Sequence, residues 1–172
     1  MAVSNASEQL KKFEEYLALY KDDVYRVALY FTKNKDDAED LTQDAFIRAY
    51  TFFHRFRNDT NFKAWILKIM RNIYITQVKK KRPTAEHNDE QLFGYETSKN
   101  TENQVLDAMR TKEVHQAINK LPDEFREVII LCELEGHSYE EIAKIIDIPV
   151  GTVRSRLHRG RMILKERLLH KT

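Results

Sequence analysis

Apolar side chains recur at steps of three and four residues along most of this 172-residue chain. The clearest stretch is residues 8–31, which predicts an amphipathic helix with a break near residues 21–23. The chain has only four Gly and three Pro, whereas folds made of strands need many such residues in tight turns. A large enzyme of alternating strands and helices is also disfavoured, because its loops need glycine. The sequence therefore predicts an all-α fold.

The apolar periods and the helix-capping signals divide the chain into separate helices. Asp36 or Asp37 can cap the second of these, and the acids that follow suit the positive end of a helix dipole. The long helix that begins at Phe62 stops before Pro83, since the residue before a proline disfavours helical backbone. The expected helices cover residues 8–31, 36–53, 62–81, 105–119, 122–136, 139–146 and 149–169.

Charge is segregated along the chain, although the net charge is only +2. Residues 1–82 hold 16 basic and 11 acidic side chains, and residues 150–172 hold seven basic and one acidic. Residues 83–104 hold one Lys and five acids, and residues 105–149 hold five basic and ten acidic side chains. Two basic blocks separated by acidic ones favour recognition of polyanions at two places, although ordinary solvated helix faces give the same pattern.

Residues 83–104 show no apolar period, and their composition is polar and acidic. A segment of this kind cannot bury enough apolar surface to fold by itself, so it predicts a flexible linker. The linker separates two expected helical domains, residues 1–82 and residues 105–172.

Several classes of protein are disfavoured by what the chain lacks. Cys132 is the single cysteine, so an internal disulfide and a multi-cysteine zinc site are excluded. The first residues do not form a signal peptide, and no apolar run approaches the ~20 residues that span a bilayer. No phosphate-binding glycine loop, metal-ligand set or nucleophile–base pair is evident, so no catalytic residue, metal or cofactor is predicted. We expect a soluble intracellular protein that is not an enzyme.

Residues 138–161 combine the features of a helix-turn-helix. A short helix begins with a capping box, in which Ser138 and Glu141 satisfy each other's backbone amides. Its inner side is expected to carry Ile142, Ala143 and Ile146. A tight turn follows, and Val153 and Leu157 then mark the inner face of a second helix.

The outer face of this second helix suits the major groove of DNA, which admits one α-helix. It carries Arg154, Ser155, His158 and Arg159. Arg156, Arg161 and Lys165 are expected to contact phosphates, which set the register without reading sequence. A basic helix that enters no groove is one alternative interpretation. A stand-alone repressor or activator that dimerises on a palindrome is another.

Four segments of the chain together resemble the extracytoplasmic-function, or group IV, sigma factors of bacteria. They are DDAEDLTQDAFIRAY (36–50), FKAWILKIMRN (62–72), LPDEFREVIILCELEGHSYEEIA (121–143) and IPVGTVRSRLHRGR (148–161). The order and spacing of the four segments match that family over nearly the whole chain. The resemblance implies a transcription initiation factor with two small helical domains, a region 2 domain of three or four helices and a region 4 helix-turn-helix domain, joined by the linker.

The resemblance also implies that core RNA polymerase and promoter DNA are the partners. Region 2 would dock on the coiled coil of the β′ subunit through Asp40, Gln43, Asp44, Phe46 and Arg48, and region 4 would meet the β flap. Region 2 would read and melt the −10 element with Phe56, Arg57, Asn58, Asn61, Lys63, Asn72, Lys79 and Lys80. Region 4 would read the −35 element with Thr152, Arg154, Ser155, Arg156, His158, Arg159 and Arg161.

Three positions need separate interpretations under this resemblance. Trp65 is either a core residue, which its spacing favours, or a stacking platform for an unpaired base. Lys68 and Ile69 stand where housekeeping sigma factors carry adjacent tryptophans, so a stringent −10 requirement is expected. Cys132 stands where the family frequently has a basic residue or Tyr, and it removes one expected phosphate contact.

The family resemblance finally implies regulation by an anti-sigma factor, in a stress or envelope response. That partner would clamp the two domains and hold an otherwise cytoplasmic protein at the membrane, without membrane insertion of this chain. The acidic linker either mimics nucleic acid in the RNA exit path of the polymerase or is a simple tether. Whether the free protein packs region 2 on region 4 stays open.

Overall fold

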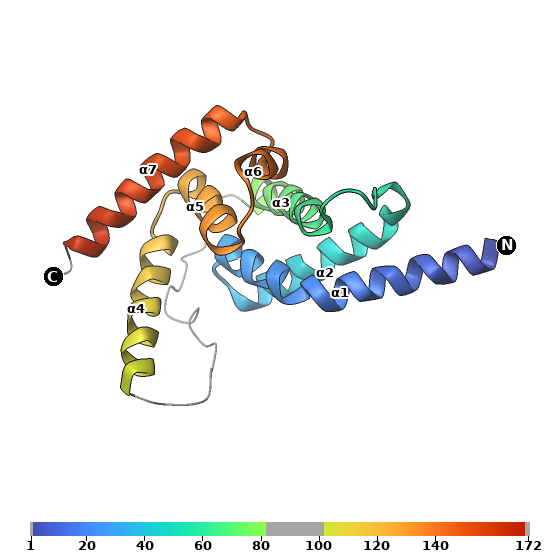
Figure 1. Cartoon of the computed structure of the whole chain (residues 1–172), viewed down its shortest axis with the longest axis horizontal. Coiled ribbons are helices and arrows are strands. Elements are labelled where there is room, and N and C mark those ends of the chain that lie inside the picture. The colour runs from blue at the N-terminus through green and yellow to red at the C-terminus, as the bar shows by residue number, and fades with distance from the viewer. Residues whose placement is uncertain (1, 82–101, 171–172) are drawn as a thin grey trace. The chain divides into compact units, whose positions relative to one another are not determined.

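The computed structural model describes residues 2–81 and 102–170, and every regular element in these ranges is a helix (Figure 1). The elements are α1 (Ala2–Thr32), α2 (Lys35–Thr51), the 3-10 turn η1 (Phe53–Arg55), α3 (Phe62–Lys81), α4 (Glu102–Asn119), α5 (Asp123–Ile129), the π-helical turn η3 (Ile130–Leu134), α6 (Tyr139–Ile146) and α7 (Val150–Leu169). The prediction of an all-α fold is confirmed.

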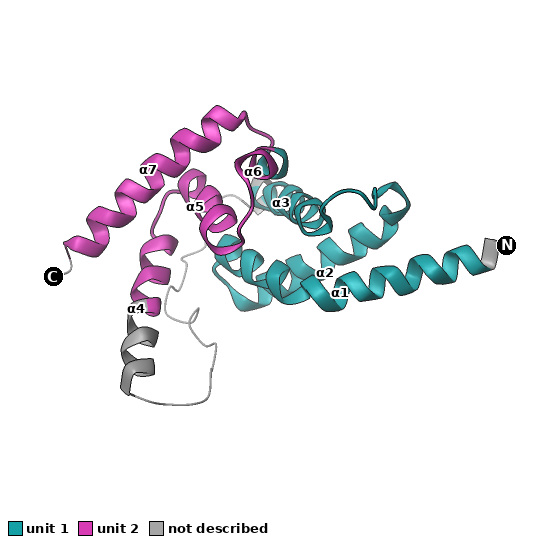
Figure 2. Cartoon of the chain, in the orientation of Figure 1, with its two compact units in different colours: residues 1–86, 144–146 teal, residues 87–143, 147–172 magenta. Residues whose placement is uncertain are grey.

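The chain divides into two compact units (Figure 2). Among the described residues, unit 1 contains 2–81 and 144–146, and unit 2 contains 102–143 and 147–170. Most of the expected linker lies outside the described residues. The helix expected to begin at residue 105 begins three residues earlier, at Glu102.

Unit 1 is built on α1, α2 and α3, each of which packs against the other two. Its fully buried side chains are Val24, Val27, Ala28, Ala38, Leu41, Ala45, Ala49, Ile66 and Met70. Three of these are alanines of α2, and a small side chain at each lets the neighbouring helices approach closely. This core sets the positions of α1, α2 and α3 relative to one another through buried contacts.

The expected break near residues 21–23 is wrong, because α1 is continuous over 31 residues. Asp23 is accommodated within the helix, where its carboxylate accepts from Arg26 one turn later. The same carboxylate also pairs with Lys63 of α3, at 3.3 Å between Oδ2 and Nζ. No glycine or proline interrupts residues 21–23, so a charged side chain with two cationic partners does not end the helix.

The cap of α2 is Asn34. The prediction that Asp36 or Asp37 caps this helix is therefore wrong. The Asn34 side-chain oxygen accepts from the backbone amide of Asp37 at 3.0 Å, and its own backbone is extended. The two aspartates lie in the first turn, where negative charge is stabilised by the helix dipole.

Unit 2 is organised around α7, which packs against α5 and α4. Gly160 of α7 faces α5, and a Cβ at this position would lie 2.9 Å from Cγ1 of Ile129. Arg126 is buried in α5 and donates to the Leu121 carbonyl oxygen at 2.9 Å, so it fixes the turn between α4 and α5. These contacts give α7 a firm support for its outward face.

Candidate nucleic-acid interfaces

The expected helix-turn-helix is present at α6 and α7. Ser138 and Glu141 form the predicted capping box, since each side chain accepts from the other residue's backbone amide, at 3.1 and 3.2 Å. Ile142 and Ile146 are buried as expected, whereas Ala143 is only half-buried. The chemistry of the cap is fully local, which explains why the sequence predicted the start of α6 to the residue.

A three-residue turn, 147–149, connects the two helices. Asp147 adopts the left-handed conformation with φ 55°, and the amide of Ile148 donates to the Ala143 carbonyl oxygen at 3.1 Å. Pro149 caps α7, and its carbonyl oxygen accepts from the amides of Thr152 and Val153 at 3.0 and 3.1 Å. Backbone hydrogen bonds of the turn residues therefore end α6 and begin α7.

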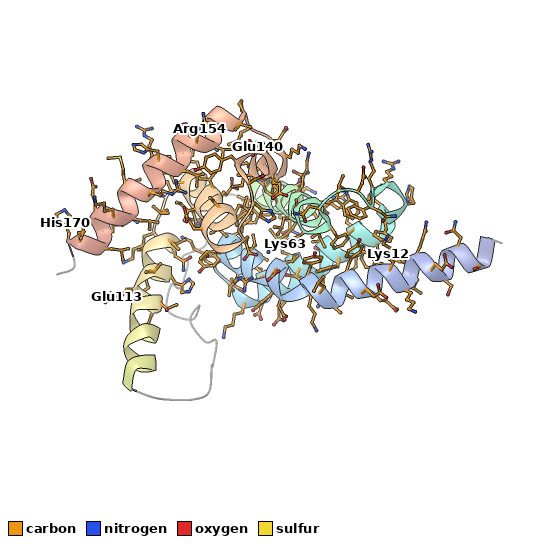
Figure 3. The ribbon with its side chains drawn as sticks, viewed as in Figure 1. Lys12, Lys63, Glu113, Glu140, Arg154 and His170 are labelled. Atoms are coloured by element: carbon orange, nitrogen blue, oxygen red, sulfur yellow. The ribbon has the colours of Figure 1, made fainter. Side chains whose placement is uncertain are left out.

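The first half of α7 separates a buried face from a charged one. Val153 and Leu157 are fully buried. Besides Gly151, the exposed residues of this half-helix are Arg154, Ser155, His158 and Arg159, and Arg154 projects outward (Figure 3). These four are the side chains that the sequence analysis expected to face base edges, and they share one outward face.

Three of the other expected DNA contacts of α7 are less available. Thr152 is half-buried. The Arg156 side chain is half-buried, and its Nη2 lies 3.8 Å from the Glu124 carboxylate of α5. Arg161 is exposed but binds Glu133 through two of its nitrogens, at 2.5 and 2.7 Å from Oε1.

The segment between α2 and α3 is a structured loop. Arg57 donates to Asp59 through Nε and Nη2, at 3.3 and 3.1 Å, and both side chains are exposed. Thr60 donates to the Arg57 carbonyl oxygen through its hydroxyl, at 2.7 Å. Asn61 caps α3, because its side-chain oxygen accepts from the Ala64 amide at 3.3 Å. Arg57 and Asn61, both expected to contact DNA, thus also build the loop, while Asn58 is exposed.

Phe56, which was expected to contact the −10 element, is not exposed on the surface of the loop. The side chain is buried, at 9% exposure, and its ring stacks on Phe53 with the centroids 5.8 Å apart. Trp65 is half-buried and contacts Phe56 and Phe62, at centroid distances of 5.1 and 5.7 Å. Phe56 is therefore a core residue of unit 1, and Trp65 lies at the edge of that core.

Tyr16 and Tyr20 of α1 belong to this aromatic cluster, and the sequence analysis did not assign them to it. The Tyr16 ring stacks on Phe62 with the centroids 4.3 Å apart and the planes inclined by 4°. The Tyr20 ring stacks on the same phenyl at 5.7 Å. Both tyrosines are half-buried. Their four-residue spacing on the apolar stripe of α1 is a signal, but it does not reveal which helix they meet.

Lys63 also differs from its expected role as a free DNA contact. Its side chain is only 16% exposed and lies among the helices of unit 1, where it pairs with Asp23 (Figure 3). Asn72 and Lys80 of the same helix are exposed. The Lys79 side chain lies outside the described residues.

The outward face of α2 carries most of the residues expected to bind polymerase. Asp40, Gln43, Asp44 and Arg48 are exposed. Gln77 of α3 donates to Asp44 at 3.4 Å, so this carboxylate has a partner within unit 1.

Phe46 was expected on the same face, but it is only 7% exposed and its ring meets Phe13 edge-on at 6.4 Å. It therefore anchors α2 to α1 instead. Two large side chains of α2, Ile47 and Tyr50, are 66% and 51% exposed.

Cys132 is half-buried in the π-helical turn η3. Burial and the Glu133 carboxylate raise the pKa of its thiol, and the Arg161 guanidinium opposes them. The thiol is therefore protonated at neutral pH, which disfavours nucleophilic or redox chemistry. In the described part of the chain, no helix has both the length and the apolar composition needed to cross a membrane.

Comparison with known proteins agrees with this geometry. The family model for sigma-70 region 2 matches residues 17–84, and the model for sigma-70 region 4 matches residues 111–164. The ECF RNA polymerase sigma factor SigW of Bacillus subtilis is 33% identical, over 98% of this chain and 97% of its own length. The chain belongs to the ECF sigma factors. As a member of this family, it directs the initiation of transcription.

Two further relatives extend the comparison of this ECF sigma factor. The sigma factor SigE of Mycolicibacterium smegmatis is 35% identical over 92% of the chain, which spans 62% of that longer protein. A solved structure of the sigma factor RpoE with the anti-sigma factor NepR, from Bartonella quintana, superposes with a TM-score of 0.71 and 29% identity. That alignment covers 92% of this chain and 97% of the other.

Proposed function

We propose that this ECF sigma factor reads a −35 element with α7 and a −10 element with the loop 54–61 and α3. In this proposal, region 2 occupies residues 1–82, a linker occupies 83–104 and region 4 occupies 105–172. The observation that carries the proposal is the basic outward face of α7, because its support by α5 leaves Arg154, Ser155, His158 and Arg159 exposed on one side.

Recognition of the −35 element rests on hydrogen bonding in the major groove. Arg154 and Arg159 can each form paired hydrogen bonds to a guanine edge. The Ser155 hydroxyl already donates to the Thr152 carbonyl oxygen at 3.1 Å, so Ser155 acts as an acceptor toward DNA. His158 lies between the two arginines in the sequence and extends the same exposed face.

Recognition of the −10 element uses a polar loop above an aromatic core. Arg57, Asn58 and Asn61 offer donors and acceptors to unpaired bases, and Asn72 and Lys80 continue along α3. The half-buried rings of Tyr16, Tyr20 and Trp65 supply faces on which bases can stack. Phe56 is buried beneath this surface and Lys63 pairs with Asp23, so neither is proposed to contact DNA directly.

Docking on core RNA polymerase uses the exposed face of α2. Asp40, Gln43, Asp44 and Arg48 are the polar contacts to the β′ coiled coil, and Phe46 holds the helix in place. Region 4 meets the β flap. The polymerase performs the chemistry, and the sigma factor itself catalyses no reaction.

An anti-sigma factor is the proposed regulator, by similarity to the Bartonella sigma factor that was solved with NepR. The sigma factor acts in the cytoplasm, where the polymerase and the DNA are, and an anti-sigma factor in the membrane would hold it there in reserve. The inducing condition is then a stress or a change in the cell envelope.

Run-off transcription tests the proposal. Core polymerase and the full chain are incubated with genomic fragments, and new start sites that depend on the chain are expected. If no start site appears while the isolated chain binds duplex DNA tightly, the protein is a stand-alone DNA-binding regulator and the proposal is wrong.

A pair of variants tests the assignment of the two DNA-binding surfaces. Arg159→Ala is expected to change preference at particular −35 positions, by about 1–3 kcal/mol for a lost base contact. Lys80→Ala is expected to weaken all promoters alike and to lower the salt slope by about one unit. Uniform effects of both variants across promoters would contradict the role given to α7.

A further inference from the structure

The Arg161 guanidinium joins two elements of unit 2. It donates to Oε1 of Glu133 through Nε at 2.7 Å, and its Nη2 lies 2.5 Å from the same oxygen. Nη2 also points at Sγ of Cys132, at 3.8 Å. Tyr139, the first residue of α6, together with Glu133 raises the pKa of Arg161. One side chain of α7 thus binds the π-helical turn η3 and is influenced by α6.

This set of contacts leaves little of Arg161 for a DNA phosphate. Glu133 neutralises its charge at short distance and occupies two of its nitrogens, which weakens the attraction of the guanidinium for a phosphate. The pair is nearly half exposed, at 47% for Arg161 and 45% for Glu133, so solvent reaches it and it contributes little to stability. The role of the Arg161–Glu133 pair is therefore inferred from its position between α7 and η3 and not from a large contribution to stability.

The residue beside Arg161 suggests why α7 needs such a contact. Val153 and Leu157 anchor the first half of α7 in the core, but Gly160 presents no side chain to Ile129 and Phe125 of α5. The packing at Gly160 therefore adds no projecting group that resists a small rotation of α7 about its axis. A rotation of 20° moves a side-chain tip about 6 Å from a helix axis by about 2 Å. A misplacement of that size breaks a bidentate contact between arginine and guanine, which needs close alignment.

We infer that Arg161 is a positioning residue of the −35 reader, which sets the final rotation of α7 through its contact with Glu133 of η3. The inference rests on the proposed function, because it concerns the same surface, and it removes Arg161 from the set of DNA contacts. Arg159, proposed to contact bases, lies two residues earlier on the same helix, and Arg154 lies about two turns earlier. The orientation of both arginines toward the base edges therefore depends on the contact between Arg161 and Glu133.

The test uses holoenzyme formed from core polymerase and the full chain, on a promoter found by run-off transcription. Wild-type activity on that promoter establishes the proposed function independently of any variant. The quantity measured is −35 discrimination, the ratio of open-complex formation on the promoter to that on the same promoter with a scrambled −35 element. A ratio cancels differences in the active fraction of each preparation.

The charge-neutral variants give opposite results under the two roles. If Arg161 positions α7, Glu133→Gln and Arg161→Gln each lower the discrimination by about two- to fivefold, the factor that an exposed ion pair can supply, and the double variant is no worse than either. The salt slope is unchanged by Arg161→Gln. If Arg161 instead contacts a phosphate, Glu133→Gln leaves discrimination unchanged and strengthens binding, and Arg161→Gln lowers the salt slope by about one unit. That second pattern would overturn the inference.

Two further variants separate positioning from general damage. Exchanging the charges, with Glu133→Arg and Arg161→Glu together, is expected to recover discrimination relative to Arg161→Glu alone. Glu124→Gln is the matched control, because this acid also faces an arginine of α7 but lies 3.8 Å from Arg156, beyond hydrogen-bond distance. A loss of discrimination in Glu124→Gln as large as that in Glu133→Gln would show that any acid of α5 or η3 matters alike, and would count against the specific role of Arg161.

Discussion

At the scale of single residues, Gly160 shows how closely α7 packs on α5. A Cβ added there would lie 2.9 Å from Cγ1 of Ile129 and 3.5 Å from Cβ of Phe125. The first distance is too short for two carbon atoms, and the second atom belongs to a part of Phe125 that cannot move without its backbone. The absence of a side chain at this position is therefore a requirement of the packing.

Gly160→Val is expected to lower the free energy of unfolding by about 2 kcal/mol, because overpacking forces α5 and α7 apart. Urea denaturation followed by circular dichroism measures the change. Gly151→Val is the control, since nothing lies within 4 Å of a Cβ at Gly151 and its substitution should be nearly neutral. Equal losses for the two variants would refute the packing argument.

The half-buried His115 gives unit 2 a dependence on pH. Burial lowers the pKa of His115 from its ordinary value of 6.5, so the unfolded chain binds the proton more readily than the folded chain. The stability that the neutral ring allows is therefore complete above pH 6.5 and falls as the pH drops below it. His115→Gln should lose less stability than the wild type between pH 7 and pH 5, as measured by thermal unfolding at each pH. His158→Gln, an exposed change, should follow the wild type.

At the scale of secondary-structure elements, local chemistry sets the boundaries of most helices. The start of α6 depends on one capping box, and α7 begins directly after Pro149. The transition from α5 to η3 is an exception that involves contacts distant in the sequence. The helix that begins at Asp123 changes to a π-helical turn at Ile130, and this turn presents Cys132 and Glu133 to α7.

Ser138→Ala is expected to cost about 1 kcal/mol, because the Glu141 amide loses its partner at the start of α6. Thermal unfolding measures the cost, and −35 discrimination should fall with it, since α6 precedes the reading helix. Ser138→Asp should restore stability because aspartate is an equally good cap. If Ser138→Ala and Ser155→Ala lower stability equally, the cap carries no special weight.

At the scale of the whole molecule, the distribution of charge matters more than its sum. The net charge is +2, yet the two basic blocks coincide with the two proposed DNA readers. Each reader alone offers few contacts, and the acidic residues between them repel DNA. Two weak sites gain affinity when a partner holds them together, because the second contact then becomes intramolecular.

The free chain should therefore bind a promoter duplex about 10²-fold or more weakly than the holoenzyme does. Electrophoretic mobility shifts at constant salt measure both affinities. Inserting five base pairs between the −10 and −35 elements should abolish the advantage of the holoenzyme but leave the free chain unaffected. An insertion that leaves holoenzyme binding unchanged would show that the two sites do not act together.

The sequence alone determined the helical class, the helix-turn-helix and the family, because each rests on local signals. Periodicity, capping residues and short motifs depend on neighbours within a few positions, which a sequence displays directly. The exposed face of α7 was predicted correctly for the same reason, since helical spacing decides which residues share a side.

Tertiary structure decided which polar and aromatic residues are available to a partner. Phe46 and Phe56 are buried, and Lys63 and Arg161 pair with acids that lie 40 and 28 positions away in the sequence. A sequence motif does not show whether its residues are buried or paired, because burial and pairing depend on how the helices pack and not on residue type. The spacing of a basic residue predicts the face that it occupies, but only the packed neighbour decides whether its charge is free for DNA.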